Sequence, residues 1–199
     1  MIVAWGDAIG LRPFHDPISE AEIAQLYAWS RDAELLQLSG GSRSELSLTE
    51  FAERLRHDHR AADPNRQVFM ILTRAGKLIG RIGCFAIDPE SHSGELGIVI
   101  GDRDFWGRGY GRDAVITLLR HLFTTTSLQR VYLFTFQENV RAQKAFAACG
   151  FRNMGTARKF LPDLGEFDGI EMEITRAEFS AKHSRPASIL PRASEMTNA

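Results

Sequence analysis

The feature that most constrains this sequence is a run of alternating glycines, Gly107-Arg108-Gly109-Tyr110-Gly111, between an apolar segment and an amphipathic one. Without Cβ atoms to block the approach, several backbone N–H groups can converge on one anion there. A helix that starts directly after the glycines adds unpaired N–H groups and the positive end of its dipole. Arg108 and Arg112 add positive charge. The run therefore predicts a site for pyrophosphate or a similar anion; the alternative is a surface turn with basic residues.

The composition shows that any such anion site must be local. The 199 residues suit one compact domain, and 44% hydrophobic and 25% charged residues are typical of globular proteins. A net charge of −1 gives no general attraction to nucleic acid or to an anionic membrane. No apolar run approaches the roughly 20 residues of a membrane-spanning helix, and no secretory signal is present. We therefore expect a cytoplasmic location, with no nucleic-acid or membrane partner.

The cysteines and histidines give no sign of a metal site. Cys84 and Cys149 lie in apolar segments without metal-ligand spacing, and we expect both to be reduced core residues. His57 and His59 lie at the basic end of a predicted helix, with no cysteine or carboxylate at ligand spacing. We interpret them as surface residues and predict no metal.

The apolar periodicity predicts alternating sheet and helix segments. Two capping boxes, Ser19 with Glu22 and Ser47 with Glu50, predict two early helix starts, and a loop over 38–42 separates those helices. Strands are predicted over 9–14, 68–74, 78–87, 95–100, 131–136, 151–157 and 169–175, and later helices over 113–124 and 140–149, the last ended by Gly150.

This order of elements predicts a mixed α/β fold of the α+β type, with a central, mostly antiparallel sheet and about four flanking helices. The continuous apolar run over 131–136 predicts a strand buried on both faces. We expect one domain over residues 1–179. Residues 180–199 are rich in Ser, Pro and Ala without periodicity, which predicts a disordered tail.

The glycine run also allows a nicotinamide-dinucleotide interpretation. Gly109 to Ala114 matches the G-x-G-x-x-[G/A] fingerprint, and Glu138 follows the next strand, where a ribose-binding acid could lie. Against this, residues 102–108 separate the fingerprint from its strand, and the chain after Ala114 is too short for a complete doubly wound sheet. The phosphate-loop pattern G-x-x-x-x-G-K-[ST] is absent.

Two separated blocks carry a more specific resemblance. Residues 102–114, with W-G-R-G-Y-G at their centre, resemble motif A of the GNAT superfamily of N-acetyltransferases, in the form of the branch that includes the ribosomal-protein N-terminal acetyltransferases. Residues 139–151 are similar to that family's N-x-x-A-x-x-x-[YF]-x-x-x-G-F. The resemblance covers about residues 9–178. It implies a GNAT-like fold with parallel strands 95–100 and 131–136 that splay apart, and an enzyme that transfers acetyl from acetyl-CoA to a primary amine by direct attack.

The resemblance also implies where acetyl-CoA lies. The pyrophosphate is expected on backbone amides of the glycine run, and pantetheine between the splayed strands. Trp106 stands where the family often has Gln or Arg, and Asn139 matches a cofactor-binding Asn that can also cap the following helix. The expected cofactor-binding residues are Ile98, Ile100, Trp106, Arg108, Gly109, Tyr110, Gly111, Arg112, Asn139 and Phe146.

The chemistry requires a neutral amine, because an ammonium has no lone pair for the thioester. Glu95 is the candidate base, at a place where several family members carry their catalytic Glu; a carboxylate in an apolar strand would have a raised pKa. The alternative is an exposed position on an alternating strand. Phe146 stands where many relatives have Tyr and cannot donate a proton. The general acid is therefore unassigned, with Tyr132 or water as alternatives.

The acceptor amine is left open. Asp163, Glu166 and Asp168 would attract a cationic amine, unless they form a solvated loop. A protein N-terminus, a polyamine, an aminoglycoside or a small metabolite amine all fit. Phe146 also motivates a second hypothesis, a non-catalytic acyl-CoA-binding sensor. The sequence leaves homodimerisation open.

Overall fold

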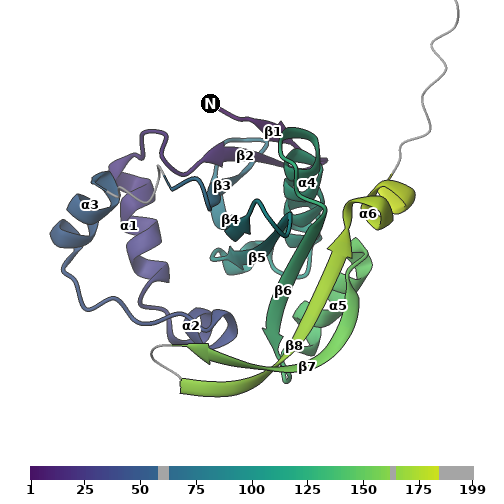
Figure 1. Ribbon diagram of the computed structural model, residues 1–199. Helices are drawn as coiled ribbons and strands as arrows, with labels where there is room; N and C mark the ends of the chain where they lie inside the picture. The colour runs from purple at the N-terminus through teal and green to yellow at the C-terminus, as the bar shows by residue number, and fades with distance from the viewer. Residues whose placement is uncertain (58–62, 162–164, 184–199) are drawn as a thin grey trace, which may run out of the picture.

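The computed structural model describes residues 1–57, 63–161 and 165–183, which form an eight-stranded sheet with helices on both faces (Figure 1). The strands are β1 (Ala4–Trp5), β2 (Ile9–Pro13), β3 (Gln67–Thr73), β4 (Leu78–Asp88), β5 (Ser93–Ile100), β6 (Arg130–Phe136), β7 (Arg152–Leu161) and β8 (Gly165–Thr175). The helices are α1 (Glu20–Trp29), α2 (Ala33–Ser39), α3 (Leu48–Arg56), α4 (Tyr110–Thr125), α5 (Val140–Cys149), α6 (Arg176–His183) and a 3₁₀ turn, η2 (Arg103–Phe105).

The sheet is mixed, as predicted. Its order is β1-β2-β3-β4-β5-β6-β8-β7. Among the described strands β5 and β6 form a parallel pair, and the other neighbours are antiparallel. In the same ranges, no helix has the length and apolar character that crossing a bilayer requires.

Two helices were not predicted. In α2, the Asp32 side chain accepts hydrogen bonds from the N–H groups of Glu34 and Leu35, both at 3.1 Å, and Gly40 ends the helix at φ 66°. This Asp32 cap was the overlooked sequence signal. In α6, the helix continues to His183, so the predicted tail boundary at residue 180 is wrong. The rest of that predicted tail, 184–199, lies outside the described residues.

The sheet separates two apolar cores. On β3, Phe69 and Ile71 belong to the core that includes α4, whereas Met70 and Leu72 belong to the core under α1 and α3. Strand β3 is therefore buried on both faces. Strand β6 is not: Leu133 is fully buried, but Phe134 on the other face is half-buried. The prediction that β6 is buried on both faces was wrong, because that second face opens on a cavity.

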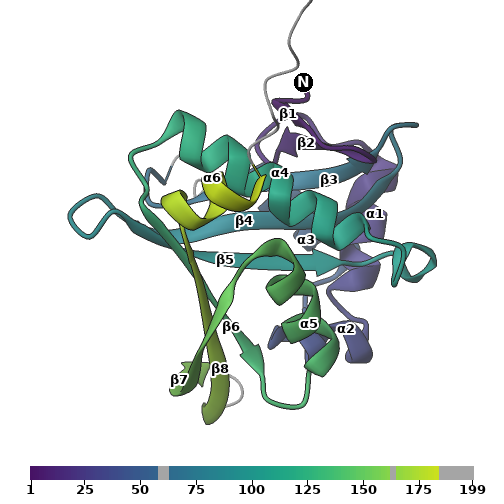
Figure 2. The same cartoon turned by 90° about the vertical axis from the view of Figure 1, so that its right-hand side faces the viewer.

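The cavity begins where β5 and β6 separate. The two strands pair only over Ser93–Glu95 and Arg130–Tyr132. Strand β6, in contrast, pairs along its whole length with β8. Figure 2 shows β6 and β8 running together away from β5. The predicted splay of the two parallel strands is confirmed.

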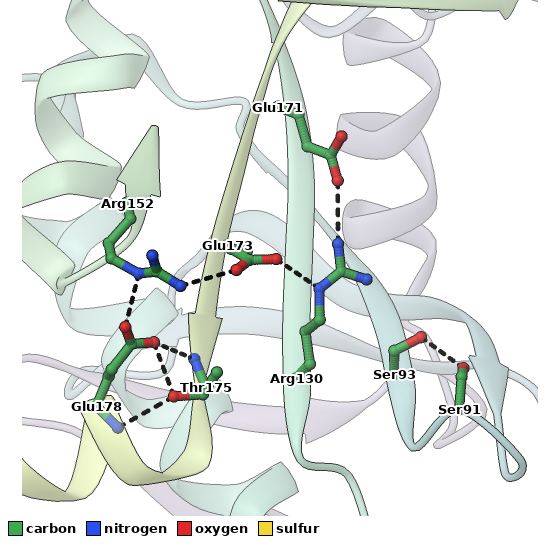
Figure 3. A network of polar contacts seen from close by, with 8 residues as sticks. All are labelled: Ser91, Ser93, Arg130, Arg152, Glu171, Glu173, Thr175 and Glu178. Carbon is green, nitrogen blue, oxygen red and sulfur yellow. Dashed lines mark hydrogen bonds and ion pairs between the residues drawn. The ribbon is translucent and has the colours of Figure 1, made fainter. Parts of the chain in front are cut away.

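Side-chain ion pairs tie β6 to β8 rather than to β5 (Figure 3). The Arg130 guanidinium donates to the Glu173 carboxylate at 2.6 Å and to the Glu171 carboxylate at 3.1 Å. From β7, Arg152 reaches the same Glu173 at 2.8 Å and Glu178 of α6 at 2.6 Å. Because these charges are linked in a network and only partly exposed, they hold β6, β8, β7 and α6 together.

Both ends of α4, the helix after the glycine run, are held by charged side chains: Asp113 near its start bonds the segment that leads into β2, and Arg176 of α6 bonds its end. The Asp113 carboxylate accepts the N–H groups of Asp7, Ala8 and Ile9 at 3.0, 2.7 and 3.1 Å. At the other end, the Arg176 guanidinium donates to the carbonyls of Phe123 (2.6 Å), Thr126 (2.8 Å) and Leu128 (2.6 Å). A carboxylate near the start and a cation near the end also complement the helix dipole.

We predict that Arg176→Met lowers the free energy of unfolding by about 2–3 kcal/mol, because it leaves the terminal carbonyls of α4 without their charged donor. Urea denaturation measures the change. Arg158→Met is the matched control: Arg158 is 67% exposed and pairs with Glu166 and Asp168 at 3.7 and 3.4 Å, so its loss should cost less than about 1 kcal/mol. Equal destabilisation by the two variants would contradict this role of Arg176.

Candidate active site

A cavity of about 720 Å³ opens between the separated strands and runs along β5. The residues that line it come from β5, β6, the glycine run, α5 and the start of α4, and also from α2, β7 and β8. The predicted site residues that line it are Glu95, Ile98, Ile100, Trp106, Gly109, Gly111, Arg112, Asn139 and Phe146. The structure thus brings together residues that lie far apart in the sequence.

Two predicted residues do not line the cavity. The Arg108 side chain is exposed, and the Tyr110 ring packs edge-on against Phe105 with the ring centroids 4.9 Å apart. Both were expected to act through their backbone N–H groups, and that role stays a prediction.

The glycine run has the backbone that an anion site needs. Gly107 and Gly109 have φ of 70° and 87°, in the left-handed region that favours glycine. A Cβ added at either position would meet no atom within 4 Å, so the space over the run is open. Gly109 is also the N-cap of α4 and supplies no side-chain acceptor to its first turn. With Arg112 lining the same cavity, these residues fit the pyrophosphate of a coenzyme A molecule.

Trp106 braces the end of β5 against the glycine run. Its indole Nε1 donates to the Ile100 carbonyl at 2.7 Å, and the Arg141 guanidinium lies 4.4 Å from its ring centroid. A pantetheine contact to the Ile100 carbonyl would have to share this oxygen. The predicted main-chain contact at Ile98 is not affected by this bond.

Asn139, the N-cap residue of α5, and Phe146, within the helix, both line the cavity. The Asn139 Oδ1 accepts the Ala142 N–H at 3.1 Å, so its interpretation as a helix cap is confirmed. Its contact with the cofactor stays a prediction. The Phe146 ring packs edge-on against Phe151, with centroids 5.8 Å apart.

Glu95 is not isolated in an apolar strand. Its carboxylate Oε2 lies 3.1 Å from the Lys159 Nζ, and the two side chains are 33% and 31% exposed. The Lys159 Nζ also lies 3.6 Å from the centroid of the Phe134 ring. The expected apolar surroundings of Glu95 were therefore wrong. Sequence reasoning missed Lys159, because 64 positions separate it from Glu95 and only the strand order brings β7 to this end of the cavity.

Tyr132, the alternative proton donor, is the strand-pairing partner of Glu95 but does not line the cavity. Burial, and then the charge of Glu95, raise the pKa of the Tyr132 hydroxyl, so it is protonated at neutral pH. The general acid remains unassigned.

The acidic residues near the β7–β8 turn do not line the cavity. Glu166 and Asp168 are exposed and lie beside Arg158, at 3.7 and 3.4 Å, while Phe167 between them lines the cavity. These positions agree with the alternative given for the two residues, solvated carboxylates, because alternate residues of a strand face opposite sides and these two face away from the cavity. Asp163 lies outside the described residues. What lines this end instead is aromatic: Phe134, Phe136, Phe160 and Phe167.

The cysteines are buried free thiols, as predicted. Burial raises the pKa of the Cys84 thiol to about 12 and that of the Cys149 thiol to about 11. His57 is exposed at the end of α3, as expected for a surface residue, and His59 lies outside the described residues. Within the described ranges, no three His, Cys, Asp or Glu residues are grouped as metal ligands.

The sequence pattern of the acetyltransferase (GNAT) domain family matches residues 11–152. The chain belongs to this family. Its predicted assignment as an acetyl-CoA-dependent N-acetyltransferase of the GNAT superfamily is thereby confirmed at the level of the family.

Curated relatives agree with this membership. This GNAT chain is 22% identical over 180 residues to an N-acetyltransferase 9-like protein of Caenorhabditis briggsae, covering 85% of the chain and 89% of the relative. It is 30% identical over 91 residues to an uncharacterized N-acetyltransferase, p20, of Bacillus licheniformis. That match covers 46% of the chain and about half of the relative's length, 51%.

Solved structures share the GNAT fold. A spermidine N-acetyltransferase from Vibrio cholerae, in complex with CoA and spermine, superposes with a TM-score of 0.72 at 20% identity, over 86% of this chain and 97% of that one. An aminoglycoside acetyltransferase in complex with coenzyme A gives 0.68 at 19% identity, over 87% and 98%. These likenesses support the fold, and they do not single out the ribosomal-protein branch.

We predict that Gly109→Ala raises the KM for acetyl-CoA at least about tenfold, equivalent to about 1.4 kcal/mol of binding, because the methyl group occupies the space over the glycine run. Gly76→Ala is the matched control: Gly76 has φ 81° in the β3–β4 turn, also with no atom within 4 Å of an added Cβ. Both changes carry the same backbone cost of about 1–2 kcal/mol. A KM unchanged in Gly109→Ala, or raised equally by both, would contradict the anion site.

We also predict that an aromatic disulfide reagent near neutral pH labels both cysteines rapidly in urea and only slowly in the folded protein. The raised pKa values leave almost no thiolate at neutral pH, and both side chains are buried. Absorbance of the released thiolate follows the reaction. Rapid labelling of the folded protein would show that a thiol is accessible.

Proposed function

We propose that this protein transfers the acetyl group of acetyl-CoA to a primary amine by direct attack in a ternary complex. The observation that carries the proposal is that one cavity contains both required parts. The open glycine run lies at a helix start, and the Glu95 carboxylate, on the strand that precedes the run, lines the same cavity. Family membership supports the donor. We assign the activity to a single domain that includes α6; the cytoplasmic location stays a prediction.

Acetyl-CoA supplies an activated acyl group, and residues of this chain would bind and position it. Backbone N–H groups of the glycine run, with Arg112, would hold the pyrophosphate. The unpaired edge of β5 beyond Glu95 would take main-chain hydrogen bonds from the pantetheine arm, because that arm replaces the missing strand partner. Phe146 would pack against the cofactor.

The reaction balances without a further reagent. The acceptor enters as an ammonium and gives one proton to Glu95 or, through it, to water. The neutral nitrogen forms a bond to the acyl carbon as the carbon–sulfur bond breaks. The nitrogen then loses a second proton, which passes directly or through water to the sulfur of the departing thiolate and gives the CoA thiol. The products are the N-acetyl amine, free CoA and one proton.

The acceptors of similar proteins set the range to test. A polyamine acetyltransferase and an aminoglycoside acetyltransferase share the fold, and a protein N-terminus is the acceptor of the branch that the sequence resembles. A non-catalytic acyl-CoA sensor remains a second candidate, motivated by the absence of a hydroxyl on Phe146. The nicotinamide alternative requires a doubly wound parallel sheet, whereas the described strands contain a single parallel pair.

We predict that the purified protein releases thiol from acetyl-CoA when an amine is present, and that Glu95→Gln lowers kcat near neutral pH by at least about a hundredfold, as loss of a general base does. Glu22→Gln is the matched control: Glu22 pairs with Arg12 at 2.7 Å on α1, outside the cavity, and glutamine can still complete its capping box.

Three outcomes separate the candidates. Turnover that depends on Glu95 but not on Glu22 supports the proposal. Turnover unchanged by Glu95→Gln contradicts the assignment of the base. Stabilisation by acetyl-CoA in a thermal shift, with no thiol release from any amine, identifies a sensor.

A further inference from the structure

The acceptor end of the cavity contains one ion pair in an aromatic wall. Glu95 and Lys159 lie 3.1 Å apart, and both line the cavity. Each is about two-thirds buried, so the pair is neither a solvated surface contact nor a fully enclosed one. The two charges cancel. This end of the cavity therefore offers a polycation no excess of negative charge.

An acceptor that binds Glu95 must take this carboxylate from Lys159, and this exchange determines which acceptors bind well. When an ammonium binds Glu95, Lys159 loses its carboxylate, and a half-buried charge without a partner is costly. Lys159 would also repel a second or third positive charge on the acceptor. A carboxylate on the acceptor removes both penalties, because the ammonium then pairs with Glu95 and the carboxylate with Lys159. The ion pair between Glu95 and Lys159 is then replaced by two ion pairs, one from each residue to the zwitterionic acceptor.

The rest of the acceptor must be apolar. Phe136 and Phe167 pack with ring centroids 4.9 Å apart, and Phe134 lies under the Lys159 ammonium. Phe160, at the rim, is 66% exposed, although it also lines the cavity. A side chain that covers these rings gains roughly 25 cal/mol for each Å² of apolar surface removed from water. The neighbouring carboxylates Glu166 and Asp168 face away and are paired with Arg158.

We propose that the acceptor is a free α-amino acid with an apolar or aromatic side chain. Its ammonium binds Glu95, its carboxylate binds Lys159, and its side chain packs on Phe134, Phe136 and Phe167. This inference rests on the proposed acetyl transfer and assigns Lys159 as the residue that determines acceptor specificity. The N-acetyl product has kept its carboxylate but lost its cation, so re-pairing of Glu95 with Lys159 favours its release.

The first test compares three acceptors with saturating acetyl-CoA: phenylalanine, phenethylamine, which lacks the carboxylate, and spermidine. We expect kcat/KM to be highest for phenylalanine, by at least about tenfold over phenethylamine, because phenethylamine lacks the carboxylate that makes a charge-assisted contact with Lys159. Spermidine is expected to be the poorest acceptor. A polycation as the best acceptor would overturn the inference and leave the proposed acetyl transfer standing.

The second test assigns the carboxylate contact to Lys159. Lys159→Met should raise the KM for phenylalanine at least about tenfold. It should leave kcat/KM for phenethylamine equal or higher, because no cation then loses its partner when the ammonium binds Glu95. Lys159→Arg should restore part of the phenylalanine KM. Arg158→Met changes the neighbouring cation on the opposite face of β7 and should alter neither value. Equal losses for both acceptors in Lys159→Met would show a structural role and overturn the inference.

A binding measurement keeps the inference testable if turnover fails. Calorimetry on the protein loaded with CoA should detect phenylalanine binding that Lys159→Met weakens, even where the proposed catalysis is absent. Thermal unfolding verifies that the variants fold. If phenylalanine does not bind the CoA-loaded wild-type protein, the inference fails whether or not another amine is acetylated.

Discussion

The site depends on the short pairing between two neighbouring strands of the sheet: β5 and β6 pair only over Ser93–Glu95 and Arg130–Tyr132. If the pairing continued, the edge of β5 would be covered and the cavity would close. Strand β6 instead pairs with β8 along its length, and Arg130 reaches Glu171 and Glu173 on that strand. Each strand thus has a stable partner on its outer side, and the gap between them is left for a ligand with its own hydrogen-bonding groups.

The same gap joins two sites of different character. At the glycine run, the proposed ligand contact is made by backbone N–H groups, which are held in place because Asp113 and Arg176 fix the two ends of α4. At the other end, the proposed contact is made by side chains from three strands, Glu95, Phe134 and Lys159, which line the cavity. Backbone recognition suits a donor that is constant, whereas side-chain recognition can be changed by substitution and therefore sets the acceptor.

Signals between neighbouring residues predicted most of the fold, whereas contacts between residues far apart in the sequence were missed. The capping boxes at Ser19 and Ser47 and the helix end at Gly150 depend on a few neighbouring residues, and all three are present. The pairing of Glu95 with Lys159 depends on strand order, which periodicity does not reveal. For the same reason, the apolar run of β6 could not be assigned to one core face and one cavity face before the covering helices were placed.

Amide hydrogen exchange with and without acetyl-CoA tests the central claim most directly. The account predicts that acetyl-CoA slows exchange along β5 beyond Glu95 and in the glycine run, at residues 96–112, while β1 to β3 are unchanged. NADH at the same concentration should protect neither segment. Protection confined to other strands, or none at residues 96–112, would contradict the conclusion that the separated strands hold the acetyl donor.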